Sequence, residues 1–155
     1  MSKTDHGYYN SEIGYIEIVG GKNTIFSVEF IEKKPTNNTE MPPYLKECIE
    51  QIDDYFRGER KVFSVNLKLQ GTDFQTKVWN QLIRIPYGET TSYKDIASKI
   101  GNPNATRAVG NANGQNKLAI IVPCHRVIGS NGSMTGYAGG IWRKEWLLKH
   151  ELTNL

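Results

Sequence analysis

The stretch IVPCHRVIGS, residues 121–130, contains the residues best suited to chemistry: a cysteine followed directly by a histidine. A thiol is a nucleophile only as its thiolate, and the ordinary cysteine pKa of about 8.5 leaves little thiolate near neutral pH. A neighbouring base can overcome this. His125 is adjacent to Cys124, and Glu151 follows a second histidine near the end of the chain. The pattern fits a nucleophilic Cys124 with a His-Glu pair as its base. It also fits a cysteine that packs in the core beside a structural histidine, because free cysteine is commonly buried.

Contact between Cys124 and His125 depends on the local backbone. The apolar segment 117–128 is predicted to be extended, so neighbouring side chains would point to opposite sides, and contact would need a turn or a bridging water. Zinc is a poorer interpretation, because adjacent cysteine and histidine are awkward ligands for one tetrahedral ion and the sequence has no CxxC or HxxxH pair. The other cysteine, Cys48, lies on the apolar stripe of a predicted helix and is interpreted as a buried, reduced core thiol.

A second informative stretch is NATRAVGNANG, residues 104–114. It predicts a helix with a face of small side chains, called here the thin face. Arg107 is its one large basic side chain. Such a helix could enter the minor groove of a duplex while an inserted arginine fills the base stack. The alternative is a helix packed tightly against its own domain. The small residues that make the face thin are Ala105, Ala108, Gly110, Ala112 and Gly114.

The elements that must position these residues change in character near residue 70. Before it, the sequence predicts a hairpin of strands over 14–20 and 24–32, a polar loop over 33–43, a helix over 44–59 and a further strand over 62–69. After it, helices are predicted over 74–85, 91–101, 102–116 and 141–152, with a glycine-rich loop over 129–140. Predicted capping residues are Thr72 or Asp73, Thr91 or Ser92, and the glycines Gly58 and Gly101.

The predicted fold class is therefore α/β (α+β). Residues 1–70 are expected to form a small strand-rich α/β domain. Residues 71–155 are expected to form a mostly helical domain with a helix-turn-helix, winged-helix-like DNA-binding motif, since two short helices are joined by a tight Gly-Asn-Pro turn.

Charge is distributed unevenly along the chain. The net charge is +3, but up to Gln70 there are 9 Lys+Arg against 11 Asp+Glu, and from Gly71 onward 10 against 5. The positive second half suits a polyanion such as nucleic acid. The composition is that of a globular domain, no apolar run is long enough to span a bilayer, and the N-terminus has no signal-peptide core, so a cytoplasmic location is expected. A monomer with no membrane partner is also expected.

The motif PCHRV, preceded by NPNATRAVG and followed by GYAGG and KEWLLKHE, resembles the O6-alkylguanine-DNA alkyltransferases, the methylated-DNA–protein-cysteine methyltransferases. The upstream stretch GTDFQTKVWNQLIRIPYGETTSYKDIA matches the same family, and YFRGERKVFSVNL matches it more loosely. The match extends from about Tyr55 to Glu151. The resemblance implies a DNA repair protein that acts on duplex DNA containing O6-alkylguanine, once per molecule and without a cofactor.

The resemblance also implies a role for individual residues. Cys124 would be the alkyl acceptor, attacking the carbon bonded to guanine O6 and keeping it as a thioether. His125 would activate the thiol through a water and be oriented by Glu151, while Asn116 would brace the loop. Tyr93 would lie close to the phosphate of the target nucleotide and donate to the base as guanine leaves.

Further implied roles concern DNA and the base pocket. Arg107 would replace the extruded base in the stack. Tyr137 and the backbone around Val127 and Ala138 would line the pocket. Ala138 stands where some members have serine, so a contact to O6 there would come from the backbone. Some members also hold a structural zinc in the first domain, but this chain has only Cys48 in its first half, and no zinc is predicted.

Three other functions remain to be weighed. A protein of the same fold could bind alkylguanine without accepting the alkyl group, although its acceptor position would not be cysteine. A helix-turn-helix regulator would want polar base-reading side chains where the third helix has alanine and glycine. A thiol hydrolase would turn over on small esters or peptides and would not need the basic second half.

Overall fold

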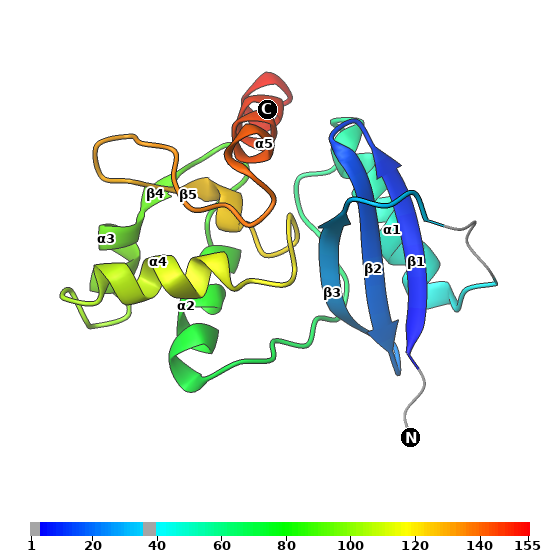
Figure 1. Cartoon of the computed structure of the whole chain (residues 1–155), viewed down its shortest axis with the longest axis horizontal. Helices are drawn as coiled ribbons and strands as arrows, with labels where there is room; N and C mark the ends of the chain where they lie inside the picture. Colours follow the sequence, from blue (N-terminus) through cyan, green and yellow to red (C-terminus); the bar gives the residue numbers. More distant parts are fainter. Residues whose placement is uncertain (1–3, 36–39) are drawn as a thin grey trace. The chain divides into compact units, whose positions relative to one another are not determined.

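The structure, a computed structural model, describes residues 4–35 and 40–155. The chain forms two compact units, Met1–Lys68 and Leu69–Leu155 (Figure 1). No helix in the described part of the chain is both long and apolar enough to cross a bilayer.

The first unit is an antiparallel sheet with one helix packed against it. Its strands β1 (Asp5–Ser11), β2 (Gly14–Gly21) and β3 (Thr24–Ile31) pair in the order β1-β2-β3, and α1 (Pro43–Phe56) packs on them (Figure 1). Alternate strand residues and one stripe of α1 supply the core. Its fully buried members include Ile16, Ile18, Val28, Leu45, Cys48 and Ile52.

Local sequence signals account for most of this unit. The predicted hairpin, the helix over 44–59 and the buried Cys48 are confirmed. Lys22 and Asn23, at the centre of the turn, have φ angles of 51° and 63°, the positive values that a tight type I′ hairpin requires. Strand β1 was not predicted, because its side chains are mainly polar. Residues 36–39 of the predicted loop over 33–43 lie outside the described residues.

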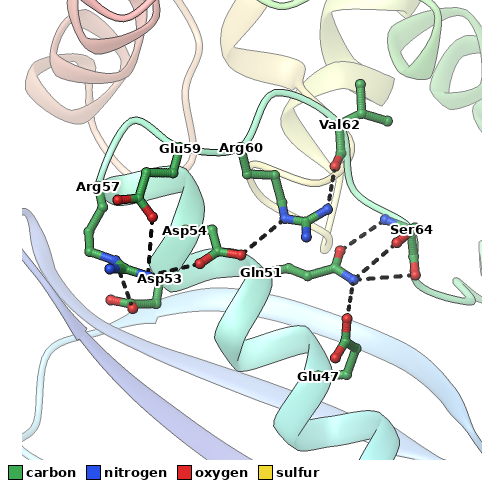
Figure 2. A network of polar contacts seen from close by, with 9 residues as sticks. All are labelled: Glu47, Gln51, Asp53, Asp54, Arg57, Glu59, Arg60, Val62 and Ser64. Carbon is green, nitrogen blue, oxygen red and sulfur yellow. Dashed lines mark hydrogen bonds and ion pairs between the residues drawn. The ribbon is translucent and has the colours of Figure 1, made fainter.

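The strand predicted over 62–69 is wrong. The segment forms a single parallel bridge between Ile25 and Leu67 at the edge of β3, not a ladder. Farther upstream it is held by the buried side chain of Gln51 on α1, which accepts from Ser64 N at 2.9 Å and donates to Ser64 Oγ at 3.1 Å (Figure 2). The alternating pattern is real, but β3 supplies only the two backbone hydrogen bonds of Ile25, to Asn66 O and from Lys68 N, and a helix side chain holds the segment at Ser64.

The second unit contains five helical segments and two very short strands in the part that the structure describes. In chain order they are α2 (Asp73–Ile83), β4 (Thr91–Ser92), α3 (Tyr93–Lys99), α4 (Thr106–Gly114), η1 (Cys124–Arg126, a 3₁₀ turn), β5 (Val127–Ile128) and α5 (Ile141–Thr153). The strands β4 and β5 pair in parallel, and α4 packs against both α2 and α3. The predicted α/β (α+β) class, with a strand-rich unit and a helical one, is confirmed.

Helix ends in the second unit follow the predicted signals. Thr72 caps α2 in a reciprocal capping box with Gln75, and Ser92 accepts from Asp95 N at 3.0 Å at the start of α3. Gly101, with φ 81°, follows α3 and allows the chain to turn into α4. Helices α3 and α4 and this turn form the predicted helix-turn-helix.

The extended conformation predicted for 117–128 is wrong except at its end, where Val127–Ile128 form the strand β5. Ile120 has a φ of 72°, Val122 N donates to Leu118 O at 2.9 Å, and Cys124 begins the 3₁₀ turn. The apolar residues are buried because the whole segment turns through the core of the unit. Local turns supply backbone hydrogen bonds between Leu118 and Arg126, so the run of apolar residues did not indicate that strand pairing is confined to its last two residues.

Candidate active site

The Cys124 thiol is buried at the start of η1, with 5% of the residue exposed. Two asparagines hold the turn around it. Asn113 of α4 donates from Nδ2 to Cys124 O at 3.3 Å, and Asn116 donates to Val122 O at 2.9 Å while accepting from Leu118 N at 3.0 Å. Asn116 therefore braces both sides of the turn that presents the thiol.

His125 lies in a fully buried cluster of polar side chains. Its Nε2 is 2.6 Å from Glu151 Oε2, and Arg126 donates to both oxygens of the same carboxylate, from Nε at 2.8 Å and Nη2 at 3.0 Å. Gly88 N donates to Glu151 Oε1 at 3.0 Å. Since the ionised carboxylate can only accept, the hydrogen-bond network assigns the ring proton to Nε2. The Nδ1 atom has no hydrogen-bond partner among the described residues and keeps its lone pair.

The pKa values in this cluster separate the roles of its members. Burial lowers the pKa of His125 despite the opposing effect of Glu151, so the imidazole is neutral near neutral pH. For Glu151, burial opposes ionisation, but the hydrogen bonds and charges of His125 and Arg126 outweigh it and hold the pKa well below its usual range. Glu151 therefore orients the ring and does not take up the proton, while His125 Nδ1 is the available base.

The Cys124 thiol itself is not ionised at rest. Burial raises its pKa, and a hydrogen bond from Asn116 and the charge of Lys144 only partly offset this. No direct hydrogen bond joins the thiol to the His125 ring in residues 40–155. Of the two routes that the sequence left open, the turn is present, and it does not by itself bring the two side chains into hydrogen-bond contact.

Two tyrosines lie within electrostatic range of Cys124. Tyr93, the first residue of α3, donates to Thr135 O at 3.0 Å, and the buried Tyr137 has a hydroxyl without a hydrogen-bond partner among the described residues. Burial raises the pKa of both phenols, and a thiolate at Cys124 would raise each further. The structure thus brings Tyr93 and Tyr137 to Cys124. Of the other two predicted pocket residues, Val127 is fully buried in β5 and Ala138 is exposed.

The small residues of α4 divide between two faces. Ala112 is buried, and its carbonyl accepts from Trp79 Nε1 at 2.8 Å, so part of the thin face does pack against its own domain. Arg107 and Ala108 are exposed, and Ala105 precedes the helix as its N-cap residue. Gly110 lies beside Tyr93, where an added Cβ would be 3.8 Å from the ring. The exposed face of α4 and the thiol site therefore adjoin through Tyr93.

Comparisons with known proteins give consistent results. A family model described as 6-O-methylguanine DNA methyltransferase, ribonuclease-like domain, matches residues 5–69, and one described as the DNA binding domain of the same methyltransferase matches residues 73–153. A methylated-DNA–protein-cysteine methyltransferase of Methanosarcina acetivorans is 48% identical over 94% of this chain and 97% of its own. The chain belongs to the methylated-DNA–protein-cysteine methyltransferase family.

Solved structures agree with this assignment. The chain is similar to the O6-methylguanine methyltransferase of Mycobacterium tuberculosis, with a TM-score of 0.89 and 44% identity over 99% of this chain and 95% of that one. A structure of the M. tuberculosis protein in complex with DNA matches with a TM-score of 0.89 and 46% identity, over 97% of this chain and 94% of that one. All site residues predicted in this methyltransferase, from Tyr93 to Glu151, lie within the matched DNA-binding domain.

Three residues of the methyltransferase site were not predicted. Arg126 stood only within the quoted cysteine motif, Asn113 only within the stretch 104–114, and Lys144 only within the helix predicted over 141–152. Lys144 is fully buried and donates to Thr135 O at 2.7 Å and to Tyr93 Oη at 3.3 Å. The sequence contained a signal that Lys144 is buried. Lys144 and Glu151 are seven residues apart and flank the buried Leu147 and Leu148, so they share the inward face of α5.

Proposed function

We propose that this methyltransferase repairs O6-alkylguanine in double-stranded DNA by transferring the alkyl group to Cys124 Sγ, once per molecule. The observation that carries the proposal is the buried His125, held by Glu151 at 2.6 Å through Nε2 and left with a free Nδ1 near a protonated, buried thiol. A free cysteine of the core would have no use for such a base. An ordinary packing role explains neither the oriented ring nor the surrounding tyrosines.

The reaction is a displacement at the alkyl carbon. The Cys124 thiol gives its proton through a water to His125 Nδ1, and the thiolate attacks the carbon bonded to guanine O6. An S–C bond forms as the C–O bond breaks, and the leaving guanine accepts a proton from the Tyr93 hydroxyl. Glu151 stabilises the imidazolium that results, and Asn116 keeps the turn in place. The thioether is stable, so each molecule acts once and needs no cofactor.

The reacting carbon lies inside a base-paired stack, so the nucleotide must be flipped out, at a cost of a few kcal/mol. The exposed side of α4 supports this role: Arg107 can fill the space left by the base, and Ala105, Ala108 and Gly110 permit close approach to the groove. The pocket for the flipped base comprises Tyr137, Val127 and the backbone at Ala138. We expect the protein to act as a cytoplasmic monomer.

A stoichiometric titration tests the proposal. A duplex with one O6-methylguanine is added in increasing amounts to a fixed amount of protein, and the methylated base remaining in the DNA is quantified after hydrolysis. The expected result is removal that stops at one lesion per protein molecule, with none removed by Cys124→Ser. Tight retention of the lesion duplex without removal would instead identify a lesion-binding protein, and continued turnover on small esters would identify a thiol hydrolase.

A further inference from the structure

Arg143 lies in the first turn of α5, where the helix itself gives no reason for a cation. The positive end of a helix macrodipole is at its N-terminus, so a positive side chain is unfavourable there. All residues of this first turn are described, and none of them is acidic. The contacts of the Arg143 side chain must therefore explain why an arginine stands here.

The Arg143 guanidinium contacts the turn that precedes α5. Residues 137–140, called here the pocket turn, are closed by a hydrogen bond from Gly140 N to Tyr137 O at 2.9 Å. Arg143 Nη1 donates to Gly139 O at 2.8 Å, and Arg143 N donates to Gly140 O at 3.1 Å. The side chain and the backbone of Arg143 thus hold two successive carbonyls of the turn that contributes Tyr137 to the proposed base pocket.

The neighbouring Trp142 limits where this guanidinium can lie. The Cζ atom of Arg143 is 4.5 Å from the centre of a ring of Trp142, although adjacent residues of a helix do not normally face each other. The contact is possible because the indole folds back over Gly140, where an added Cβ would be 3.3 Å from two indole atoms. Trp142 is 56% exposed, so it supports the guanidinium at the surface and adds little to the core.

We propose that Arg143 is a positioning residue that determines specificity for the alkyl group: by holding Gly139, it keeps the pocket turn close to the thiol and limits the size of the group that can be transferred. This inference rests on the proposed function. A methyl group needs little space beyond the base, whereas a larger group such as benzyl needs room beside the thiol, on the side of Tyr137. The bonds that form and break in the transfer are unchanged.

Tyr137 connects the pocket turn with the thiol. Burial raises the pKa of its hydroxyl well above the usual value, a thiolate at Cys124 would raise it further, and the charge of Arg143 acts in the opposite direction. Both residues therefore lie within electrostatic range of Tyr137. The Tyr137 hydroxyl has no hydrogen-bond partner among the described residues. The position of this side chain thus depends on packing and on the backbone of the pocket turn, which Arg143 holds.

The test compares two alkyl groups on the same base in the same duplex. Single-turnover rate constants are measured with O6-methylguanine and with O6-benzylguanine, in wild type and in Arg143→Met, which keeps an unbranched side chain but has no donor. The variant should raise the ratio of benzyl to methyl transfer on the order of 10-fold, the lower end of the discrimination that one methylene gives in a pocket. Lys149→Met, on the exposed side of α5, removes an equal charge and should leave the ratio unchanged.

Two further measurements keep the inference testable if Arg143→Met does not fold. Trp142→Ala removes only an exposed ring, and it should raise the same ratio by a smaller factor because the guanidinium loses its support. Hydrogen exchange of the Gly140 amide reports the pocket turn directly, since this amide donates to Tyr137 O, and it should be faster in Trp142→Ala than in wild type.

Equal slowing of both transfers by Arg143→Met, or a ratio equal to that of wild type, would overturn the inference while leaving the proposed function intact. An equal shift of the ratio in Lys149→Met would also overturn it, because charge and not the contact with Gly139 would then be responsible. If only Trp142→Ala can be measured, an unchanged ratio and an unchanged exchange rate at Gly140 would overturn it. Absence of transfer from both duplexes in wild type would overturn both proposals together.

Discussion

Two arginine clusters, one in each unit, contain similar groups in different surroundings. In the first unit, Arg57 contacts three carboxylates, those of Asp53, Asp54 and Glu59, at 3.0–3.3 Å, but 55% of its side chain is exposed (Figure 2). In the second unit, Glu151 supplies the one carboxylate that pairs with Arg126 among the described residues, and 7% of the Arg126 side chain is exposed. The cluster with more ion pairs is the weaker one, because water and salt screen exposed charges.

The difference shows where fixed geometry comes from. Side chains around Arg57 can exchange partners with water at little cost, so this cluster does not hold any side chain in one fixed orientation. Removing one partner around Arg126 would leave a charge buried without compensation, so the arrangement is held firmly. Only the second cluster can keep His125 in a single orientation, and the site residues depend on that rigidity.

The largest effect is expected from Glu151→Gln. The substitution keeps the shape but leaves Arg126 buried without its counter-ion, so the free energy of unfolding should fall by about 3–5 kcal/mol. Urea unfolding measures it. Glu145→Gln, on the exposed side of the same helix α5, is the matched control and should change stability little. Equal losses of unfolding free energy from the two variants would mean that the buried carboxylate matters no more to stability than an exposed one on the same helix.

Acid should weaken the second cluster selectively. The folded-state pKa values of His125 and Glu151 both lie below their ordinary values, so the unfolded chain binds more protons as the pH falls. Stability is therefore complete above about pH 6.5, declines below it through His125, and declines further below about pH 4.3 through Glu151. Below about pH 4.3, unfolding free energies should fall more steeply in wild type than in Glu151→Gln, which has no carboxyl to protonate at this position. Parallel curves would contradict the assignment.

An intermediate effect is expected from Gln51→Ala in the first unit. Gln51 is 1% exposed, and its loss frees the backbone of Ser64 (Figure 2). We expect the free energy of unfolding to fall by about 1–3 kcal/mol, the cost of unsatisfied buried polar groups. Ser64→Ala removes only the hydroxyl and should cost less. A loss no larger than that of Ser64→Ala would show that the amide does not hold the segment.

The smallest effect is expected from Arg57→Ala, despite its three ion pairs. The thermal midpoint should equal that of wild type within error at physiological salt, since exposed ion pairs contribute little. Measuring it again at low salt sharpens the test, because screening is then weakest. A clear drop in the midpoint at both salt concentrations would reverse the ranking of the two clusters.

The features predicted correctly from the sequence are those that depend on residues close together in the chain. Of the alternatives predicted for the caps, Thr72 caps α2 and Ser92 caps α3, because each capping bond is made within one helical turn. The strand predicted over 62–69 failed because alternation does not specify a partner. The segment 117–128 failed because an apolar run predicts burial and not backbone conformation.

Some residues of the site were predicted and others were missed, for the same reason. The resemblance pointed to His125 and Glu151, and the structure brings them together from η1 and α5. Lys144 and Asn113 were missed because their polar side chains are buried only by contacts with distant segments. Such contacts exist only after the chain has folded.

The most direct test of the central claim is the intact mass of the protein after reaction with an equimolar duplex containing one O6-methylguanine, followed by mapping of the modified peptide. The account predicts a gain of one methylene, located on Cys124 and absent in Cys124→Ser. An unchanged mass, or a methyl group located on another residue, would contradict it.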